Sequence, residues 1–503
     1  DPAWKEKAKE AVAQMKIYPD TARQWFLAVI DWLKEWACAR TTGFGTPLPW
    51  GKGWIIETLS DSTIYMAFYT INKHIRACGI KPEQLTPEVF DYIFYGKGSE
   101  DALSKAVGIS AEILREMREE FLYWYPFDLR VSAKELVPNH LSFCIFHHVA
   151  LFPPEHWPRA IGVNGMLMIE GKQMHKSKGN FVTMKNAVER YGADATRCAL
   201  LLGAEGMDDP DWRSENAADI QSKLESLRSF ALSIIESART NEDTHLEKWL
   251  LSRLQQRIED VTANLEELKT RSALEIALFE VWNDFRWYMR RKGKTDAKAA
   301  QEALEIWLRL LAPFAPHICE ELWSAMGKRT FISLAEWPKI DKTKVNATAE
   351  EQENLIKDLI DDTLNVLKAT KITPKRICYY TAADWKRQVY RRVIAQTVEG
   401  EVKVNEVMKQ LSQDPSLREN MKAVASFVPK VIKAMSRLPN ERKARIAKIE
   451  MLNEKEIIEA ARGFLQERFN AEVAVYSEED KARYDPKQRA ALAMPSQPAI
   501  YIE

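Results

Sequence analysis

The chain has 503 residues, of which 46% are hydrophobic and 29% are charged. Lysine plus arginine and aspartate plus glutamate each total 72, so the formal net charge at pH 7 is zero. This length accommodates about three domains of roughly 150 residues each, and the hydrophobic content excludes a wholly disordered or fibrous protein. No apolar run reaches the roughly 18 residues of a membrane span, so we expect no membrane association and a cytoplasmic location.

The beginning of the chain, Asp1-Pro2-Ala3-Trp4-Lys5, has neither an initiator methionine nor the basic and apolar segments of a signal peptide. We therefore expect a processed or split piece of a larger protein.

Six cysteines are far apart in the sequence, with no C-x-x-C pair. This spacing favours buried free thiols in a reducing compartment over a disulfide framework or a zinc site, and we expect no metal ligands of this kind. The six are Cys38, Cys78, Cys144, Cys198, Cys319 and Cys378.

The first 215 residues mix helices, loops and short β segments. Glycine and proline at 43–50 exclude a helix or a central strand there, and the short charged helices expected over 82–125 suggest an insertion rather than core. Apolar residues at helical spacing predict further helices. In chain order we expect helices near 21–36, a loop and an apolar helix over 129–149, a β segment over 160–169, a polar loop over 171–180 and a helix over 184–191.

From about 218 to 350 the pattern is almost entirely helical. Heptad-like stretches over 249–268 and 274–291 predict antiparallel helices with amphipathic faces, hence a helix bundle. Pro313 and Pro316 interrupt it. The last third alternates strands near 376–380, 472–476 and 499–502 with charged helices from 383 to about 468. This alternation predicts a small α/β domain at the end of the chain.

Local charge is uneven although the total is zero. Between residues 371 and 448 there are 18 Lys/Arg and 7 Asp/Glu, a net of +11. Such a stretch is a candidate for binding a polyanion. The alternative is a helix face whose charges are simply solvated.

The loop at 171–180 reads G-K-Q-M-H-K-S-K-G-N. Three lysines, a hydroxyl and flanking glycines suit a mobile cationic loop that closes over polyphosphate and neutralises developing charge. A lysine ammonium is a compact point charge on a flexible stem. By composition alone, an ordinary basic surface loop is the alternative.

This loop resembles the lysine-rich signature of class I aminoacyl-tRNA synthetases, K-M-S-K-S followed by K-G-N. Further segments resemble the leucyl-tRNA synthetase family of the archaeal and eukaryotic-cytosolic type, in order along nearly the whole chain. They are 36–40 (W-A-C-A-R) with 45–50 (G-T-P-L-P-W), 57–67 (E-T-L-S-D-S-T-I-Y-M-A) with the later Trp212, 312–323 (A-P-F-A-P-H-I-C-E-E-L-W) and 493–503 (A-M-P through P-A-I-Y-I-E).

The resemblance implies three domains: 1–215 as the C-terminal half of a Rossmann-like catalytic domain with the 82–125 insertion, 216–350 as a tRNA-binding helix bundle, and 351–503 as a tRNA-binding α/β domain. It also implies functional residues. Lys176, Ser177 and Lys178 match catalytic loop positions. Lys176, Met174, Glu135 and Gly165 would contact ATP, and Ser62, His140 and Tyr65 the leucine and adenylate pocket.

His140 has the alternative of a core histidine whose hydrogen bonds are made within the protein. For Tyr65, and likewise for Trp50, we favour the alternative of a simple core aromatic. The implied reaction is activation of leucine with ATP and Mg²⁺ to leucyl-adenylate, followed by transfer to tRNA(Leu). Cations of the basic stretch would meet phosphates of the tRNA. They include Lys375, Arg376, Lys386, Arg387, Arg391 and Arg392.

Two family elements are missing: the H-x-G-H signature and the editing insertion, both of which precede this region in the family. The signature loop also departs from the pattern at Gln173 and His175, and Ala133 stands where many archaeal relatives have glycine. We therefore weigh three hypotheses: one subunit of a split synthetase that needs an N-terminal half, a tRNA-binding paralogue that no longer acylates, or a structural subunit of a synthetase assembly.

Overall fold

The computed structural model describes residues 1–174, 179–237, 240–241, 243–293, 298–399 and 403–503. The chain divides into two compact units. Unit 1 comprises Asp1–Leu224 and Val261–Glu275, and unit 2 comprises Glu225–Asp260 and Ile276–Glu503. Among the helices described, none is long and apolar enough to cross a bilayer.

Unit 1 is built on a three-stranded parallel sheet in the order β1-β5-β4. The central strand β5 (Ala160–Asn164) pairs with β1 (Lys16–Tyr18) on one side and with β4 (Arg130–Ala133) on the other. In the part of the chain that is described, β4 pairs with no other strand. Its outer edge is therefore open, and Val131 on β4 is 58% exposed.

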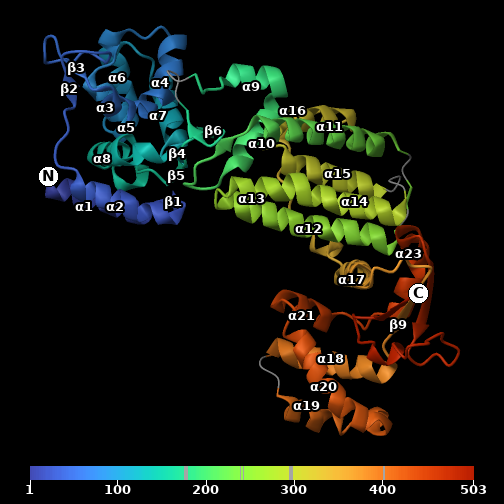
Figure 1. The fold of residues 1–503 in the computed structure, drawn as a ribbon. Helices are drawn as coiled ribbons and strands as arrows, with labels where there is room; N and C mark the ends of the chain where they lie inside the picture. Colours follow the sequence, from blue (N-terminus) through green and yellow to red (C-terminus); the bar gives the residue numbers. More distant parts are fainter. Residues whose placement is uncertain (175–178, 238–239, 242, 294–297, 400–402) are drawn as a thin grey trace. The chain divides into compact units, whose positions relative to one another are not determined.

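Three helices pack on one another beside this sheet (Figure 1): α1 (Pro2–Gln14), α2 (Arg23–Trp32) and α8 (Ser142–Leu151). The helix expected near 21–36 is present but shorter, because α2 ends at Trp32. Its buried side chains are Phe26, Val29 and Ile30, whereas Trp25, Trp32 and Trp36 are exposed. A π-helical segment, η4 (Val137–Leu141), leads into α8.

The segment over 82–125 contributes to the core, so its description as an insertion outside the core is wrong. The helices α5 (Pro87–Tyr95), α6 (Glu100–Val107) and α7 (Ala111–Trp124) follow α3 (Thr58–Ser62) and α4 (Tyr65–Ala77). Side chains at every third or fourth position of α5 and α7 are fully buried and join the main core of unit 1. These are Val89, Ile93, Leu114, Met117 and Phe121.

The β segment expected over 160–169 consists of two strands, because the chain turns at Gly165. After β5, the short strand β6 (Met168–Ile169) pairs with β7 (Lys172–Gln173) and with β8 (Asp211–Trp212). The helices α9 (Met184–Tyr191) and α10 (Ala193–Gly203) lie between β7 and β8 in sequence, and a hairpin of β2 (Ala39–Arg40) and β3 (Ile55–Ile56) precedes α3.

The helix bundle expected from the heptad pattern is present. Trp307 of α15 stacks on Phe285 of α14, with ring centroids 5.0 Å apart, and contacts Trp282 of the same helix. A helix begins at Pro316 after the break at Pro313, because proline is tolerated in the first turn. The elements are α11 (Ser214–Glu236), α12 (His245–Glu266), α13 (Thr270–Glu275), η7 (Ile276–Glu280), α14 (Val281–Lys292), α15 (Lys298–Leu311), α16 (Pro316–Ala325) and α17 (Ala347–Thr370).

The chain closes with a mixed sheet in the order β10-β9-β11, in which β10 runs parallel and β11 antiparallel to β9. This confirms all three strands expected in the last third. The elements are β9 (Arg376–Thr381), α18 (Asp384–Glu399), α19 (Val404–Leu411), α20 (Met421–Met435), α21 (Asn440–Lys448), α22 (Glu454–Ala460), α23 (Arg462–Phe469), β10 (Glu472–Ser477) and β11 (Ala499–Ile502).

All six cysteines are free thiols. Four are buried, as expected, but Cys38 and Cys78 are exposed. Cys38 directly precedes β2 and Cys78 directly follows α4. The spacing of the cysteines along the sequence does not show whether such positions are buried.

Candidate active site

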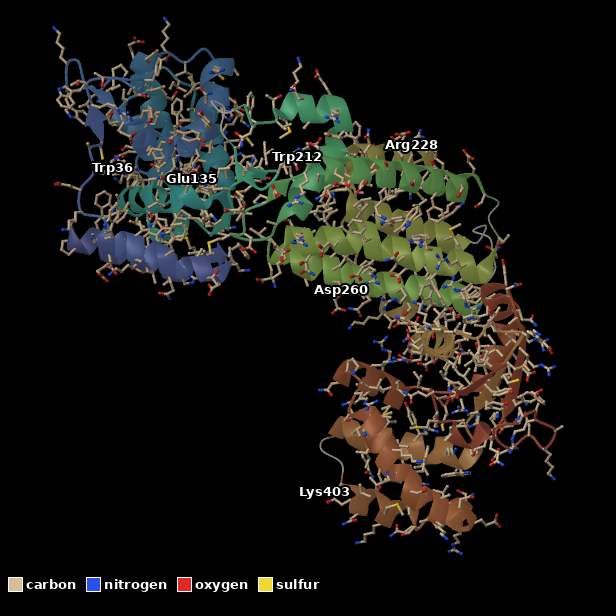
Figure 2. All side chains as sticks on the ribbon, in the orientation of Figure 1. Trp36, Glu135, Trp212, Arg228, Asp260 and Lys403 are labelled. Atoms are coloured by element: carbon tan, nitrogen blue, oxygen red, sulfur yellow. The ribbon has the colours of Figure 1, made fainter. Side chains whose placement is uncertain are left out.

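Two predicted ATP contacts lie at the carboxyl ends of neighbouring parallel strands. Glu135 follows β4 and is exposed, and Gly165 follows β5. Figure 2 labels Glu135 within unit 1. In open parallel sheets, ligands bind outside the carboxyl ends of the strands, so both residues lie at the expected edge.

The turn after β5 requires glycine. A Cβ atom at Gly165 would lie 1.9 Å from the carbonyl oxygen of Asp208. Next to it, the Met166 N–H donates to Asp209 Oδ1 at 2.7 Å, and Lys134 Nζ lies 2.6 Å from the same oxygen. These two contacts hold the pKa of Asp209 below its usual range. The ends of β4 and β5 are therefore tied to one turn, residues 205–210.

The lysine-rich loop starts from a hydrogen-bonded base. The Gly171 N–H donates to Asp211 Oδ1 at 2.8 Å, and the Asn180 side-chain amide donates to the Gln173 carbonyl at 2.7 Å. Met174 is partly buried. The catalytic positions expected in this loop, Lys176, Ser177 and Lys178, lie outside the described residues, as does His175.

Ser62 and His140, two of the residues predicted to line the leucine and adenylate pocket, lie next to each other in the structure. Ser62 Oγ lies 2.9 Å from His140 Nε2, and His140 is buried on η4. Burial and the Arg130 guanidinium hold the pKa of His140 below its usual range, while Glu57 opposes this.

Two aromatic residues that we expected in the core lie at the surface. Trp50 is 84% exposed and Tyr65 is 36% exposed. Tyr65 packs edge-on against Tyr69, with ring centroids 4.6 Å apart. The preference for core packing was therefore wrong for both residues.

Arg130 contacts His140, although the sequence patterns did not single it out. Its Nη2 lies 3.2 Å from His140 Nδ1. The available signal was a cation at the start of a short strand, directly before the segment Ser132-Ala133-Lys134-Glu135 that carries a predicted ATP contact.

The cations predicted to contact tRNA occupy different environments. Lys375 and Arg391 are exposed. Arg376 pairs with Glu472 at 2.9 Å. Lys386 is buried, and its ammonium donates to the carbonyls of Ala491 and Ala493 at 2.8 and 3.0 Å and pairs with Glu478 at 2.9 Å.

Two further predicted cations form ion pairs with carboxylates of unit 2. Arg387 pairs with Asp384 at 2.8 Å, and Arg392 pairs with Asp414. Within the described residues, Arg391 has no such carboxylate partner. Exposed and unpaired, it presents its charge to solvent.

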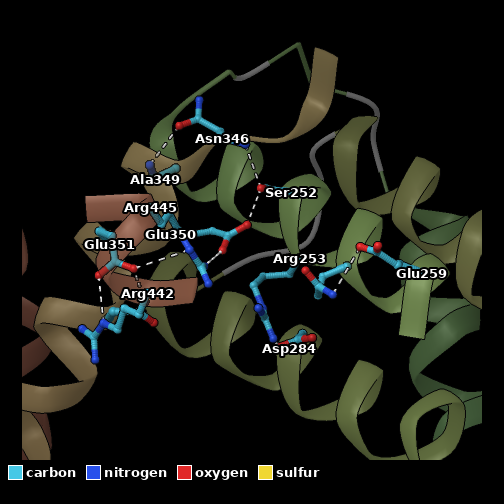
Figure 3. A network of polar contacts seen from close by, with 12 residues as sticks. Ser252, Arg253, Glu259, Asp284, Asn346, Ala349, Glu350, Glu351, Arg442 and Arg445 are labelled. Carbon is cyan, nitrogen blue, oxygen red and sulfur yellow. Dashed lines mark hydrogen bonds and ion pairs between the residues drawn. The ribbon is translucent and has the colours of Figure 1, made fainter. Parts of the chain in front are cut away.

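Part of the basic stretch is neutralised inside unit 2 (Figure 3). Arg442 of α21 pairs with Glu351 and Asp358 of α17, at 3.1 and 2.9 Å. Arg445 pairs with Glu350, which also accepts from Ser252 Oγ at 2.5 Å. These ion pairs join α21 to α17. Fewer cations of the basic stretch are therefore available to a polyanion than its net charge of +11 suggests. The described residues contain no cluster of three or more potential metal ligands.

Comparison with known proteins agrees with these features. A family model described as the anticodon-binding domain of tRNA ligase matches residues 247–378, and one described as tRNA synthetases class I (M) matches residues 101–226. With the parallel sheet, the bundle and the closing α/β sheet, these matches confirm the expected fold class.

Curated relatives match along the whole chain. The leucine–tRNA ligase of Pyrococcus abyssi is 44% identical over 514 residues, covering 99% of this chain and 51% of the relative. That of Methanothrix thermoacetophila is 42% identical over 506 residues, covering 100% and 52%. A solved ternary complex of Agrobacterium radiobacter K84 agnB2 LeuRS, tRNA and LeuAMS has a TM-score of 0.44 and 19% identity, over 68% of this chain and 37% of that one.

The chain spans about half the length of the curated relatives it matches. Within that half, the resemblance is continuous. Over its whole length the chain is therefore similar to about half of a leucine–tRNA ligase, with a segment that matches the class I synthetase model followed by one that matches the anticodon-binding-domain model.

Proposed function

We propose that this chain is the C-terminal component of a leucine–tRNA ligase, which activates leucine with ATP and transfers it to tRNA(Leu) together with a separate N-terminal half. The observation that carries the proposal is the identity of 44% to a leucine–tRNA ligase over 99% of the chain. A cytoplasmic location is part of the same proposal and rests on the family.

In this proposal the residues at the carboxyl edge of the sheet bind ATP. The exposed Glu135 carboxylate accepts from ribose hydroxyls, and Lys176, with Ser177 and Lys178 beside it, stabilises the negative charge on the phosphates. Mg²⁺ would share that charge. Met174 at the base of the loop and the Gly165 turn help to form the nucleotide site.

The amino-acid pocket is proposed around Ser62, His140 and Tyr65. The described hydrogen bond between Ser62 and His140 supports this assignment, because it holds two polar side chains from distant parts of the sequence at one place. In the first step, the leucine carboxylate attacks the α-phosphate of ATP, giving leucyl-adenylate and pyrophosphate. In the second, a ribose hydroxyl at the tRNA 3′ end takes the leucyl group.

The need for an N-terminal half is supported by the sheet of unit 1. The outer edge of β4 is open among the described residues, with Val131 exposed beside it. An open edge of a buried-type parallel sheet is a site for a further strand. The bundle and the exposed cations Lys375 and Arg391 would bind the tRNA backbone.

The test is leucine-dependent exchange between ATP and pyrophosphate, measured for the chain alone and with an N-terminal half that carries the H-x-G-H signature. We expect exchange only with both halves present. Exchange in neither condition, with tRNA binding intact, would instead support a tRNA-binding paralogue that no longer acylates. The altered loop positions Gln173 and His175 favour that second candidate.

A further inference from the structure

The carboxylate of Asp209 receives donors from the segments that follow two neighbouring strands. Its Oδ1 accepts the Met166 N–H at 2.7 Å, shortly after β5, and lies 2.6 Å from the ammonium of Lys134, directly after β4. The two strands pair as far as Ala133 and Asn164. One carboxylate oxygen therefore fixes the course of the chain where it leaves each strand.

Asp209 is held in place by the backbone around it. Gly165 leaves room for the Asp208 carbonyl oxygen, which lies only 1.9 Å from the position that a Cβ atom would take. Lys134 Nζ also donates to the Met207 carbonyl at 3.2 Å. Lys134 thus contacts this turn at two points, and the ion pair is more than a chance approach of two flexible side chains.

Glu135 shares a short helical turn with Lys134. Both belong to the 3₁₀ helix η3 (Lys134–Leu136), in which consecutive side chains point about 120° apart because a turn has 3.0 residues. The Glu135 carboxylate is exposed, and within the described residues it makes no hydrogen bond or ion pair. Its direction is therefore set by the turn, and the turn is held through Lys134.

We propose that Asp209 is a positioning residue for nucleotide binding: through its ion pair with Lys134 it orients η3, so that the Glu135 carboxylate meets the ribose hydroxyls of ATP. The proposal rests on the proposed function, in which Glu135 accepts from those hydroxyls. Asp209 itself touches no substrate.

Two other carboxylates of this turn do not make the contact with Lys134 in the structure. Glu205 accepts from the Ser272 N–H at 2.8 Å, and Asp208 is exposed. Because Asp208 directly precedes Asp209, a variant at position 209 leaves a second carboxylate nearby. A change of Lys134 removes the contact whichever carboxylate takes part, so both sides of the pair are tested.

The exposure of the pair separates positioning from stability. The Lys134 side chain is 30% exposed and that of Asp209 is 38% exposed, and an ion pair with this much solvent contributes little to the free energy of unfolding. A positioning role therefore predicts a clear change in nucleotide binding with little change in stability. A purely structural role predicts that all substrates are affected together.

The test is ATP–pyrophosphate exchange with both halves present, using ATP and 2′,3′-dideoxy-ATP, which lacks the ribose hydroxyls. Asp209→Asn keeps an acceptor for the Met166 N–H and removes the charge. We expect the KM for ATP to rise roughly tenfold, as for the loss of one hydrogen bond to a charged group, while the KM values for dideoxy-ATP and leucine stay unchanged. An unchanged KM for ATP, or an equal rise for all three, would overturn the proposal.

Variants of the partner and a matched control complete the experiment. Lys134→Met should reproduce the effect, and combining it with Asp209→Asn should add nothing, because both act on one contact. Lys134→Arg should keep most of the affinity for ATP. Asp128→Asn breaks the 2.9 Å pair with Arg159, just before the amino ends of the same two strands, and should change no KM. Additive effects in the double variant would overturn the proposal.

Two complications have defined outcomes. If Asp209→Asn does not fold, Lys134→Met is compared with Lys134→Arg, and an equal KM for ATP in these two overturns the proposal. Absence of exchange in the wild type contradicts the proposed function, and equilibrium dialysis then compares the binding of ATP and dideoxy-ATP. A preference for ATP that Asp209→Asn loses supports positioning; an equal preference in both proteins, or no preference in the wild type, overturns it.

Discussion

Lys134 Nζ lies 2.6 Å from Asp209 Oδ1, and this ion pair joins the residue after β4 to the turn before β8. The same carboxylate accepts the Met166 N–H directly after Gly165. One aspartate thus holds together the ends of two parallel strands and the base from which the β6–β7 hairpin departs. Glu135 directly follows Lys134, and Gly165 directly precedes Met166. The positions of both predicted ATP contacts therefore depend on the contacts of Asp209.

The Gly165 turn gives the first prediction. Gly165→Ala would place a Cβ 1.9 Å from the Asp208 carbonyl oxygen, and because that atom is backbone, the turn must shift. We expect unit 1 to lose about 1–3 kcal/mol, measured as faster hydrogen exchange of the β5 amides. Gly463→Ala in α23 is the control, since no atom lies within 4 Å of its Cβ. Equal exchange of the β5 amides in both variants would contradict the close packing.

The second prediction concerns Glu353, which is fully buried in the bundle. It accepts from Trp287 at 2.7 Å, from Arg291 at 2.9 and 3.0 Å and pairs with His245 at 2.8 Å. Burial alone would raise its pKa, but the bonds from His245 and Arg291 lower it to about 2. Because this is below the ordinary 4.5, the carboxylate stabilises the fold above pH 4.5, and the contribution is lost as the pH falls toward 2.

The size of this effect is about 3 kcal/mol, from 1.4 kcal/mol per pKa unit. Glu353→Gln should cost about 3–5 kcal/mol at pH 7, because Arg291 then remains buried without a counter-charge. Urea denaturation of both proteins at pH 7 and pH 3 checks this. If the two proteins differ as much at pH 3 as at pH 7, the linkage to Glu353 is wrong.

Glu454 gives the opposite dependence on pH. It is buried, and burial raises its pKa to about 7 although the Ser496 N–H donates to it at 2.6 Å. Its other oxygen, Oε2, is buried without a hydrogen-bond partner. A folded pKa above the unfolded value of 4.5 means that stability is full below pH 4.5 and is lost as the pH rises through 7.

Glu454→Gln removes this loss while keeping an acceptor for the Ser496 N–H. We expect the variant to be more stable than the wild type at pH 8, by about 3 kcal/mol at most, and equal to it at pH 4. Thermal unfolding at the two pH values is the measurement. A variant that is less stable at pH 8 would show that the folded protein stabilises the ionised carboxylate, and would contradict a raised pKa of Glu454.

The basic stretch predicts a salt-dependent interaction with tRNA. Arg391→Glu changes an exposed cation without an ion-pair partner among the described residues, and we expect weaker binding with a shallower dependence of log K on log salt. The slope should change by roughly 0.7–0.9 for each phosphate that is no longer neutralised. Lys339→Glu, an exposed cation of unit 2 outside residues 371–448, is the matched control. The same slope in wild type and Arg391→Glu would leave the stretch as a solvated helix face.

Lys176 is predicted to act on ATP and not on tRNA. Lys176→Ala should lower ATP–pyrophosphate exchange by about tenfold or more, because a charge-assisted interaction in the transition state is removed, while the affinity for tRNA stays near wild type. Lys172→Ala, at an exposed position on β7, is the control. An unchanged exchange rate in Lys176→Ala would remove this lysine from the catalytic site.

Local patterns in the sequence were sufficient for many elements. The helix at 184–191 and the strands at 376–380 and 472–476 follow from periodicity and composition, which act over a few residues. The core role of this segment was missed because in α7 the charged residues outnumber the apolar ones that recur every third or fourth position. Val89 and Phe121 show that a minority of buried positions is enough.

Contacts between distant residues were beyond the sequence. Lys386 belongs to the basic stretch by composition, but it is buried because Glu478 and two carbonyls more than 90 residues away surround its ammonium. Similarly, Ser62 and His140 are 78 residues apart. The resemblance placed both in one pocket, but the contact of Arg130 with His140 depends on a distance that periodicity does not encode.

The central claim is that this chain supplies the C-terminal part of an active leucine–tRNA ligase. Its most direct test is transfer of radiolabelled leucine to tRNA(Leu) by this chain mixed with an N-terminal half carrying H-x-G-H. We predict charging that requires both polypeptides and ATP, and that falls with Lys176→Ala. No charging by the pair, while this chain still binds tRNA(Leu), would contradict the claim and identify the chain as a tRNA-binding homologue without ligase activity.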